Sequence, residues 1–167
     1  PPIQVQLDNQ EPICSKQYRL MEADNQEANK QVEAMLRSNV IEPSISPWNS
    51  PVLFVNKKMV DKEGNTVPER RMCVDLRAVN SKTSKINFPI PTVDHTIHKL
   101  RGCSYFTCFD ILSGFWHLTM AEDVRQYFAF STEEGHYQFK VLPFGWVNSP
   151  FYFQRFTQTC IANQAKD

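Results

Sequence analysis

The chain lacks the bulk features that would assign it to a simple class of protein. Lys and Arg together number 18, as do Asp and Glu, so no charge excess indicates a nucleic-acid or membrane-surface role. Its apolar runs extend over a few residues only, far below the ~20 needed to span a bilayer, and no basic-then-apolar leader opens it. Any binding to nucleic acid must therefore come from local patches.

Paired cysteines and metal-ligand spacings are missing as well. The 5 cysteines are odd in number and form no C-x-x-C pair, and the 4 histidines do not converge at any metal spacing. We therefore expect reduced thiols in an intracellular protein, cytoplasmic or nuclear, that is neither secreted nor anchored in a membrane. The residues concerned are Cys14, Cys73, Cys103, Cys108, Cys160, His95, His98, His117 and His136.

Hydrophobic periodicity in the first half of the chain predicts an arm, a helix and a hairpin. Residues 1–20 are proline-rich and predict an extended arm, whereas apolar residues at helical spacing predict an amphipathic helix over 22–39. β-Branched and aromatic residues at 52–55 predict a strand, and a turn around Gly64 connects it to a second strand within 70–80.

The second half predicts two helices, a strand and another hairpin. A short helix is expected over about 92–100, followed by an aromatic-rich strand over 104–111 that ends near Asp110. A hairpin closes around Gly135, and a final helix is expected to be capped by Asn148 or Ser149, with Pro150 at its first position. With 167 residues, the chain suits one α+β domain or two lobes that share a core.

The stretch "FDILSGFW" places one carboxylate, Asp110, in an apolar run. An unpaired charge at the end of a buried strand is costly, so this acid needs solvent, a turn to cap or a cation. A lone Asp in such a place is most often a solvated strand-end carboxylate. The surrounding residues decide between these interpretations.

Five segments, in this order and at these separations, resemble the fingers and first half of the palm of a reverse transcriptase. The likeness is strongest to the RNA-directed DNA polymerase of gypsy-type LTR retrotransposons and covers essentially the whole chain. It implies a right-hand polymerase fold, α+β with antiparallel strands and a few helices, in which 1–84 and 118–147 form fingers and 85–117 and 148–167 a partial palm. The segments are "VIEPSISPWNSPVLFVNKK", "RRMCVDLRAVN", "FPIPTVD", "YFTCFDILSGFWHLTM" and "YQFKVLPFGWVNSPFYFQRF".

The resemblance implies that Asp110 is a catalytic metal ligand. Polymerases of this family use two metal ions to orient the attacking and leaving oxygens and to neutralise charge. Hard, oxygen-ligated Mg²⁺, or Mn²⁺ in its place, would bind the Asp110 carboxylate and the backbone carbonyl of Ile111. Pairing with a cation would explain why a charged Asp110 is tolerated in an apolar run.

Four further residues match nucleotide-binding positions of the family. Ser113 and Gly114 fall where backbone N–H groups meet the triphosphate, and composition alone leaves a simple turn after a strand as the alternative. Phe115 matches the aromatic ring under the sugar, which excludes a 2′-hydroxyl, although one of 12 phenylalanines taken alone is more often a core residue. Phe144 matches a residue that packs against the nucleotide, and Phe in this place favours the retrotransposon branch.

Two basic residues of the expected fingers hairpin match phosphate contacts. Arg71 is fixed by its distance to "VDLR", and a guanidinium can bind two phosphate oxygens at once. Lys57 is the counterpart on the other strand, but the long insertion "MVDKEGNTVPE" leaves the register between Lys57 and Lys58 open. A solvated basic strand edge is the alternative for both.

Two residues are weaker matches to template contacts. Trp48, in "SPWNSP", could lie against the template strand or serve as a packing anchor. Arg77 in "VDLR" could contact template phosphate or pair with Asp75, which alternation places on the same face of a strand. A structural role is favoured for Asp75.

The family's Tyr-x-Asp-Asp hairpin, thumb and RNase H domain are not found in these residues. Only one of three catalytic carboxylates is present, so whether the chain is an enzyme stays open, and we expect it to be inactive, and to bind no metal, alone. The remaining polyprotein, a second copy or another protein would cover the palm edge. RNA or DNA template-primer and a deoxynucleotide would bind the complete enzyme.

A retained, non-catalytic module that binds nucleic acid or a protein is the alternative function. In that case a stripe of basic residues would face phosphates, and binding would weaken steeply as salt rises. The stripe would consist of Lys57, Lys58, Arg70, Arg71, Arg77, Lys82 and Lys85.

Overall fold

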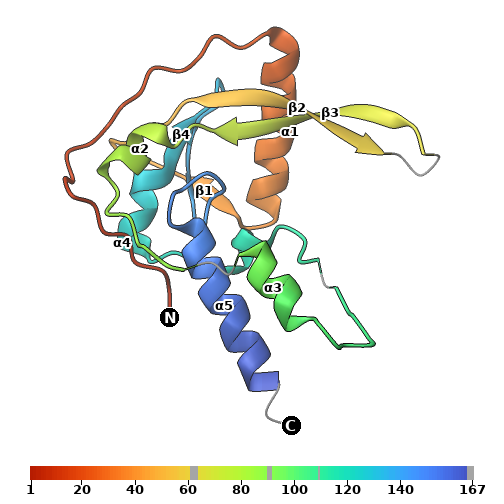
Figure 1. Cartoon of the computed structure of the whole chain (residues 1–167). Coiled ribbons are helices and arrows are strands. Elements are labelled where there is room, and N and C mark those ends of the chain that lie inside the picture. Colours follow the sequence, from red (N-terminus) through yellow and green to blue (C-terminus); the bar gives the residue numbers. More distant parts are fainter. Residues whose placement is uncertain (61–63, 90–91, 109, 165–167) are drawn as a thin grey trace.

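A computed structural model describes residues 1–60, 64–89, 92–108 and 110–164, without the side chains of 58–60, 66–69 and 161–164 (Figure 1). It contains helices and antiparallel strands, as the sequence predicts for an α+β protein. One sheet has the strand order β1-β5-β4, and a second consists of β2 and β3. Among the described residues no helix is both long and apolar enough to cross a membrane.

The N-terminal arm is extended, as predicted, and it is tied to the body of the protein at several points. Ile3 is buried, and its backbone exchanges hydrogen bonds with Thr119 (2.9 Å) and Ala121 (3.0 Å). Farther along, Asp8 N–H donates to the carbonyl of Lys82 at 2.8 Å. The arm therefore joins segments that lie more than 30 residues apart.

Helix α1 (Glu22–Arg37) confirms the predicted amphipathic helix. Ala28, Val32 and Met35 are buried along one face, at the spacing that brings helical residues to the same side. The helix ends at Arg37, and Asn39, with its φ of 58° and its backbone bond to Leu36, follows the left-handed capping pattern common just after helix C-termini. The chain turns there directly into the short strand β1 (Ile41–Pro43).

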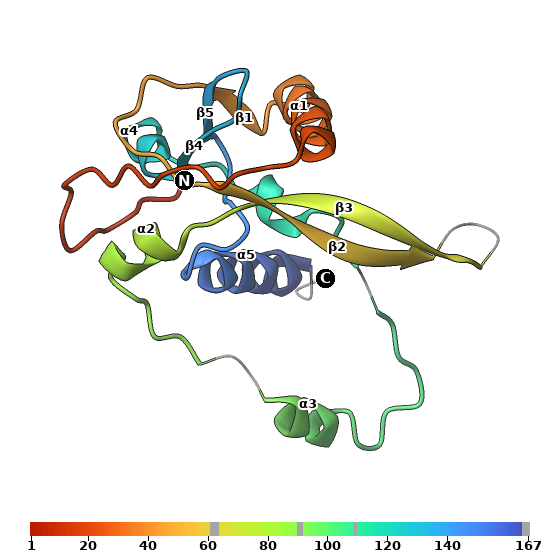
Figure 2. The same ribbon diagram turned by 90° about the horizontal axis from the view of Figure 1, so that it is seen from above.

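Strands β2 (Val52–Val60) and β3 (Thr66–Val74) form the predicted hairpin, with β2 extending beyond the expected 52–55. The pair projects from the body as a two-stranded ribbon (Figure 2). α1 lies on one side of this ribbon and helix α5 (Ser149–Gln164) on the other (Figure 2). Gly64 adopts a φ of +86°, as expected near the turn.

Two glutamine side chains pair with the ribbon near its base as an additional strand would. The amide of Gln17 donates to the carbonyl of Val52 (2.7 Å) and accepts from its N–H (2.8 Å). On the other strand, Gln31 of α1 donates to the carbonyl of Arg70 (2.9 Å) and accepts from the N–H of Met72 (3.1 Å). Backbone groups at both edges are thereby satisfied without a neighbouring strand.

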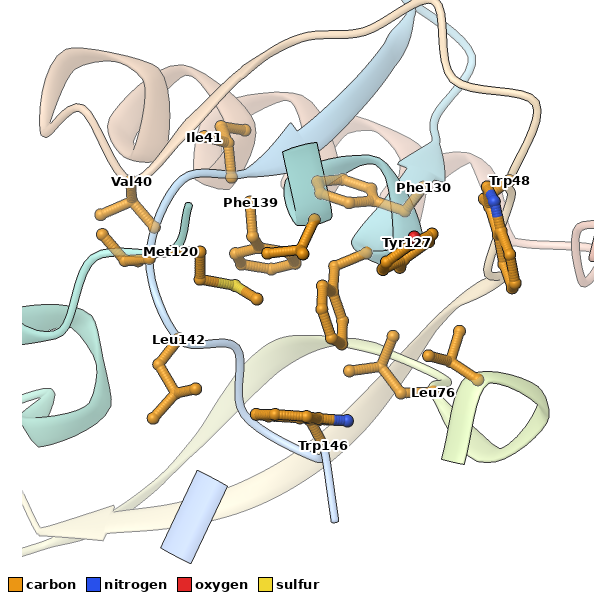
Figure 3. Packing of buried hydrophobic residues seen from close by; sticks show 14 of the residues in the cluster. Val40, Ile41, Trp48, Leu76, Met120, Tyr127, Phe130, Phe139, Leu142 and Trp146 are labelled. Carbon is orange, nitrogen blue, oxygen red and sulfur yellow. The ribbon is translucent and has the colours of Figure 1, made fainter. Parts of the chain in front are cut away.

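The core lies between α1, the three-stranded sheet and the loop that carries Trp146 (Figure 3). Strands β4 (Ala129–Ser131) and β5 (His136–Phe139) form the hairpin predicted around Gly135, and β5 also pairs with β1. Aromatic rings dominate the interior: Phe128 packs edge-on against Trp146 with ring centroids 5.4 Å apart. The fully buried rings also include Phe130 and Trp48.

The remaining elements are short. Helices α2 (Arg77–Lys82) and α4 (Glu122–Arg125) flank the core. The 3-10 helix η1 (Gly114–His117) follows a sharp turn at Ser113, and the 3-10 helix η2 (Gln126–Phe128) continues directly from α4. α2 corrects the prediction of continuous strand through residue 80, because the chain leaves β3 at Val74 and turns into a helix. Asp75 and Arg77 therefore do not lie on one strand.

Helix α3 (Val93–Lys99) confirms the predicted helix, and the side chain of Thr92 caps it by accepting from the N–H of His95. None of its residues is buried, and Figure 2 shows it apart from the other elements. The predicted strand over 104–111 is wrong for the described residues, none of which is in a strand. A strand requires a hydrogen-bonded neighbour, and no described segment pairs with this one.

Replacing Gln31 tests the pairing at the base of the ribbon. In Gln31→Met, a carbonyl and an N–H of β3 lose their partner, so we expect the free energy of unfolding to fall by about 2 kcal/mol. Urea denaturation of the chain and of the variant measures this difference. Gln26→Met is the control, because Gln26 lies on the same helix, is exposed and bonds only Glu22 among the described interactions. An equal loss in both variants would contradict the role of Gln31.

Candidate active site

The turn before η1 has a backbone conformation that few residues adopt. Ser113 has φ 50° and ψ 41°, in the left-handed region, and its carbonyl accepts from the N–H of Trp116 at 2.8 Å. The turn directs Gly114 against α5. A Cβ at Gly114 would lie 2.6 and 2.7 Å from two carbons of the Phe153 ring, so a side chain here would force that ring to move.

Four aromatic side chains meet at this turn, and we refer to Phe115, Trp116, Phe144 and Phe153 as the aromatic cluster. Phe115 and Phe144 have ring centroids 5.0 Å apart, and the Phe153 ring meets Phe115 edge-on at 5.4 Å. Trp116 packs edge-on against Phe144 at 5.9 Å. The structure thus brings together the two phenylalanines that sequence matching assigns to the nucleotide. Phe144 keeps an exposed fraction of 51%.

The loop that carries Phe144 is held by side chains of residues 80–86. The amide of Asn80 donates to the carbonyl of Gly145 (2.8 Å) and accepts from the N–H of Val147 (2.9 Å). The hydroxyl of Thr83 accepts from Nε1 of Trp146 at 3.1 Å.

The same loop is tied to the start of α5. Asn148 donates to the carbonyl of Ser84 (3.0 Å) and accepts from the N–H of Ile86 (3.1 Å). Ser149 donates to the carbonyl of Pro143 at 2.8 Å. These side chains join the loop to its neighbours rather than cap the helix, whose first residue is Ser149, one position before the proline.

Asp110 and Ile111 are both exposed, three or fewer residues before the Ser113 turn. Among the described interactions the Asp110 side chain forms no hydrogen bond or ion pair, so its oxygens are available to a ligand. The described residues contain no group of three His, Cys, Asp or Glu side chains that could hold a metal ion. Asp110 would therefore be one ligand of a larger set.

The strand register selects Lys57 rather than its neighbour as the companion of Arg71. Arg71 lies opposite Val55, and Lys57 follows Val55 by two residues, so both basic residues are on the same face of the ribbon. Both are exposed. The face is the one turned away from α1, because Arg70, on the opposite face, forms an ion pair with Asp24 of α1.

Trp48 is a packing anchor, which corrects its candidate role as a template contact. Its exposed fraction is 2%, and it packs edge-on against Tyr127 at 5.1 Å. Lys82 lies over the ring, with Nζ 5.8 Å from the centroid. No face of the ring is left for a nucleic-acid base to stack on.

Arg77 pairs with Asp75, as one of the two sequence interpretations proposes. Its Nε and Nη2 donate to the carboxylate at 2.9 and 2.7 Å, and Tyr18 donates its hydroxyl to the same carboxylate at 2.8 Å. These hydrogen bonds, those from Arg77 first, hold the pKa of Asp75 well below its ordinary value and raise that of Arg77. The Arg77 side chain remains 82% exposed, so its outer face can still meet a phosphate.

Sequence reasoning missed Phe153 and Asn80, which position the candidate site. Phe153 belongs to the helix predicted from residue 148, but nothing local indicates which of its aromatic residues faces Gly114. Asn80 follows the VDLR match by three residues, and its partners lie 65 and 67 residues away. The contact between Gly114 and the Phe153 ring identifies Phe153, but it can be recognised only in the structure.

Comparison with known proteins identifies one family across most of the chain. A family model described as "Reverse transcriptase (RNA-dependent DNA polymerase)" matches residues 55–167. The Pol polyprotein of the Drosophila melanogaster transposon 412 is 36% identical over 91% of this chain and 12% of its own length. The Pol polyprotein of the transposon gypsy, from the same species, is 36% identical over 89% of this chain and 14% of its own length. The chain thus spans less than a fifth of either polyprotein.

Two solved structures share the fold. The crystal structure of the prototype foamy virus protease–reverse transcriptase matches 97% of this chain and 21% of that one, with a TM-score of 0.80 and 23% identity. A foamy viral protease–reverse transcriptase in complex with double-stranded DNA matches 98% of this chain and 27% of that one, with a TM-score of 0.75 and 23% identity. The likeness confirms the predicted fold class.

The Asp75–Arg77 pair predicts a pH dependence of stability. Because the pKa of Asp75 is depressed on folding, the charged carboxylate stabilises the fold above its ordinary pKa of about 3.9, and this contribution is lost at lower pH. The stability difference between the chain and Asp75→Asn should be largest near neutral pH and shrink between about pH 5 and about pH 2. Urea denaturation at a series of pH values measures it, with the exposed Asp94→Asn as control. A difference that does not change with pH would contradict the pairing.

Proposed function

The chain belongs to the reverse transcriptase family, and we propose that it supplies the fingers and the first half of the palm of a retroelement's RNA-directed DNA polymerase. In this proposal residues 1–84 and 118–147 are fingers, and 85–117 and 148–167 are palm. Every buried hydrophobic residue among the described ones lies in the two fingers ranges. This distribution supports the division, because the fingers then have a core of their own and the palm segments rest on it.

The pairing of Phe115 with Phe144 supports this function most directly. Segments 29 residues apart bring these rings to a centroid distance of 5.0 Å, beside the Ser113 turn. An aromatic surface here would contact the sugar of an incoming deoxynucleotide, with Phe115 excluding a 2′-hydroxyl. Backbone N–H groups of Ser113 and Gly114 would meet the triphosphate.

The Lys57 and Arg71 face of the ribbon would bind the phosphates of the same nucleotide. Both residues lie on the side of the ribbon opposite α1, and α5 lies on that side (Figure 2). A guanidinium can donate two parallel hydrogen bonds to phosphate oxygens, whereas an ammonium acts as a point charge. Arg77, on the outer surface of α2, is the remaining candidate for the template strand.

Reverse transcriptases use divalent metal ions, and we assign Asp110 as a ligand of Mg²⁺ or Mn²⁺. An exposed carboxylate that has no protein partner among the described interactions suits a hard cation, as does the adjacent carbonyl of Ile111. When bound, the metal ions orient the attacking and leaving oxygens and neutralise developing charge. Because the described residues hold no three-ligand group, further carboxylates from outside them would complete the site.

The completed polymerase would bind an RNA or DNA template-primer and a deoxynucleotide. The rest of a polyprotein, a second copy or another protein would complete the palm. A non-catalytic binding module is the weaker proposal, because three residues of its basic stripe are engaged within the chain. Arg70 pairs with Asp24, Arg77 with Asp75, and Lys82 donates to the carbonyl of Glu11.

Replacing the candidate metal ligand tests catalysis. With the chain expressed together with its flanking coding sequence, Asp110→Asn should abolish extension of a primed RNA template, because the metal site loses a charged ligand. Its circular dichroism and melting temperature should stay unchanged, since Asp110 is exposed. Asp94→Asn is the matched control and should extend normally. Extension by Asp110→Asn at the wild-type rate would refute the catalytic proposal and leave the binding module.

Replacing Arg71 tests the phosphate face. Arg71→Ala should raise KM for the deoxynucleotide about tenfold or more, because a charged hydrogen bond contributes about 1.5–3 kcal/mol. Arg71→Lys should recover only part of the loss, since it restores charge without the bidentate geometry. Steady-state kinetics with a fixed template-primer measure both variants. An unchanged KM in Arg71→Ala would remove this residue from the nucleotide site.

A further inference from the structure

The contact between Gly114 and Phe153 couples α5 to the turn that carries Phe115. A Cβ at residue 114 would lie 2.6 Å from Cζ of Phe153, closer than non-bonded carbon atoms approach one another. The glycine at this position is therefore explained by the ring of Phe153. Space for a triphosphate is not needed to account for it, which differs from the role that family matching assigns.

Phe153 contacts Phe115 as well as Gly114. The two rings meet edge-on, with centroids 5.4 Å apart and planes at 72°, a favoured arrangement of aromatic pairs. Phe115 also packs against Phe144, with ring centroids 5.0 Å apart. The position of the Phe115 ring is therefore set by one neighbour from α5 and one from the loop before it.

α5 is in turn held at a fixed position relative to the fingers. The Tyr152 hydroxyl donates to the carbonyl of Gln4 in the N-terminal arm at 3.0 Å, and its ring stacks on Trp146 at 5.7 Å. Ser149 bonds the carbonyl of Pro143. Because Tyr152 adjoins Phe153, these contacts fix the helix at the point where its ring meets Gly114.

We propose that Phe153 is a positioning residue that sets the selectivity of the site for deoxynucleotides over ribonucleotides. It does so through Phe115: the Phe153 ring packs against both Gly114 and Phe115, and so holds the Phe115 ring in the position where it excludes a 2′-hydroxyl. A smaller residue at 153 would let the Phe115 ring move toward α5. A larger residue at 114 would displace the Phe153 ring and, with it, the Phe115 ring. This inference rests on the proposed polymerase function.

Four proteins test the proposal, each expressed with its flanking coding sequence: wild type, Phe153→Leu, Gly114→Ala, and the double variant Gly114→Ala/Phe153→Leu. The measurement is the ratio of kcat/KM for a deoxynucleotide to that for the matching ribonucleotide on a primed RNA template. We expect Phe153→Leu to lower this ratio about fivefold, the fold-change that loss of one aromatic pair corresponds to. Gly114→Ala should lower deoxynucleotide incorporation, and the double variant should recover it, because leucine leaves room for the added methyl group.

Phe151→Leu is the matched control. Phe151 lies two residues earlier on the same helix, and its ring packs against Phe88 at 5.2 Å and Tyr152 at 5.0 Å, with no contact to Phe115 among the described ring contacts. It should lose stability to a similar extent while its selectivity stays that of the wild type. Melting temperatures of all five proteins separate loss of fold from loss of selectivity.

The outcomes distinguish the inference from the function on which it rests. A wild-type protein that extends no primer overturns the proposed function, and the inference falls with it. If the wild type extends and discriminates, a Phe153→Leu ratio within twofold of wild type overturns the inference alone. An equal fall of the kcat/KM ratio in Phe151→Leu also overturns the inference alone. So does a double variant that incorporates deoxynucleotides no faster than Gly114→Ala.

Discussion

Side-chain hydrogen bonds between residues 80–86 and residues 143–149 hold the candidate site together. The amide groups of Asn80 and Asn148 each bridge two backbone groups that belong to neither helix nor strand. Unpaired backbone groups in such a loop would cost about 1–3 kcal/mol each. These specific hydrogen bonds therefore fix the conformation of the loop. The loop in turn sets the positions of Phe144, of the start of α5 and of the Phe153 ring.

Local sequence patterns were sufficient to predict elements whose conformation depends only on residues within the element itself. The apolar spacing of α1 and the turn at Gly135 each act within a few residues, and the structure agrees with them. Resemblance to a family supplied the fold class, and it brought Phe115 and Phe144 to one site. Their contact at 5.0 Å is consistent with that matching.

Features that depend on distant partners could not be predicted. The segment over 104–111 has the composition of a strand, but composition supplies no neighbour, and its described residues are unpaired. For Trp48 the sequence left a template contact and a packing anchor equally open, and only its burial against Tyr127 decides between them. Register separated Lys57 from the adjacent lysine only when the facing residues of β2 and β3 were known.

The amide pairing of Gln17 and Gln31 fixes the base of the ribbon and leaves its outer part to move as a unit. Gln31 reaches as far along the ribbon as Arg70, which lies opposite Asn56, and β2 continues from there to Val60. At ~3.3 Å per residue, this outer part of β2 is about 13 Å long. A rigid tilt of about 10° at the base would carry its end about 2 Å, a large part of the step between a water-separated phosphate and a direct contact.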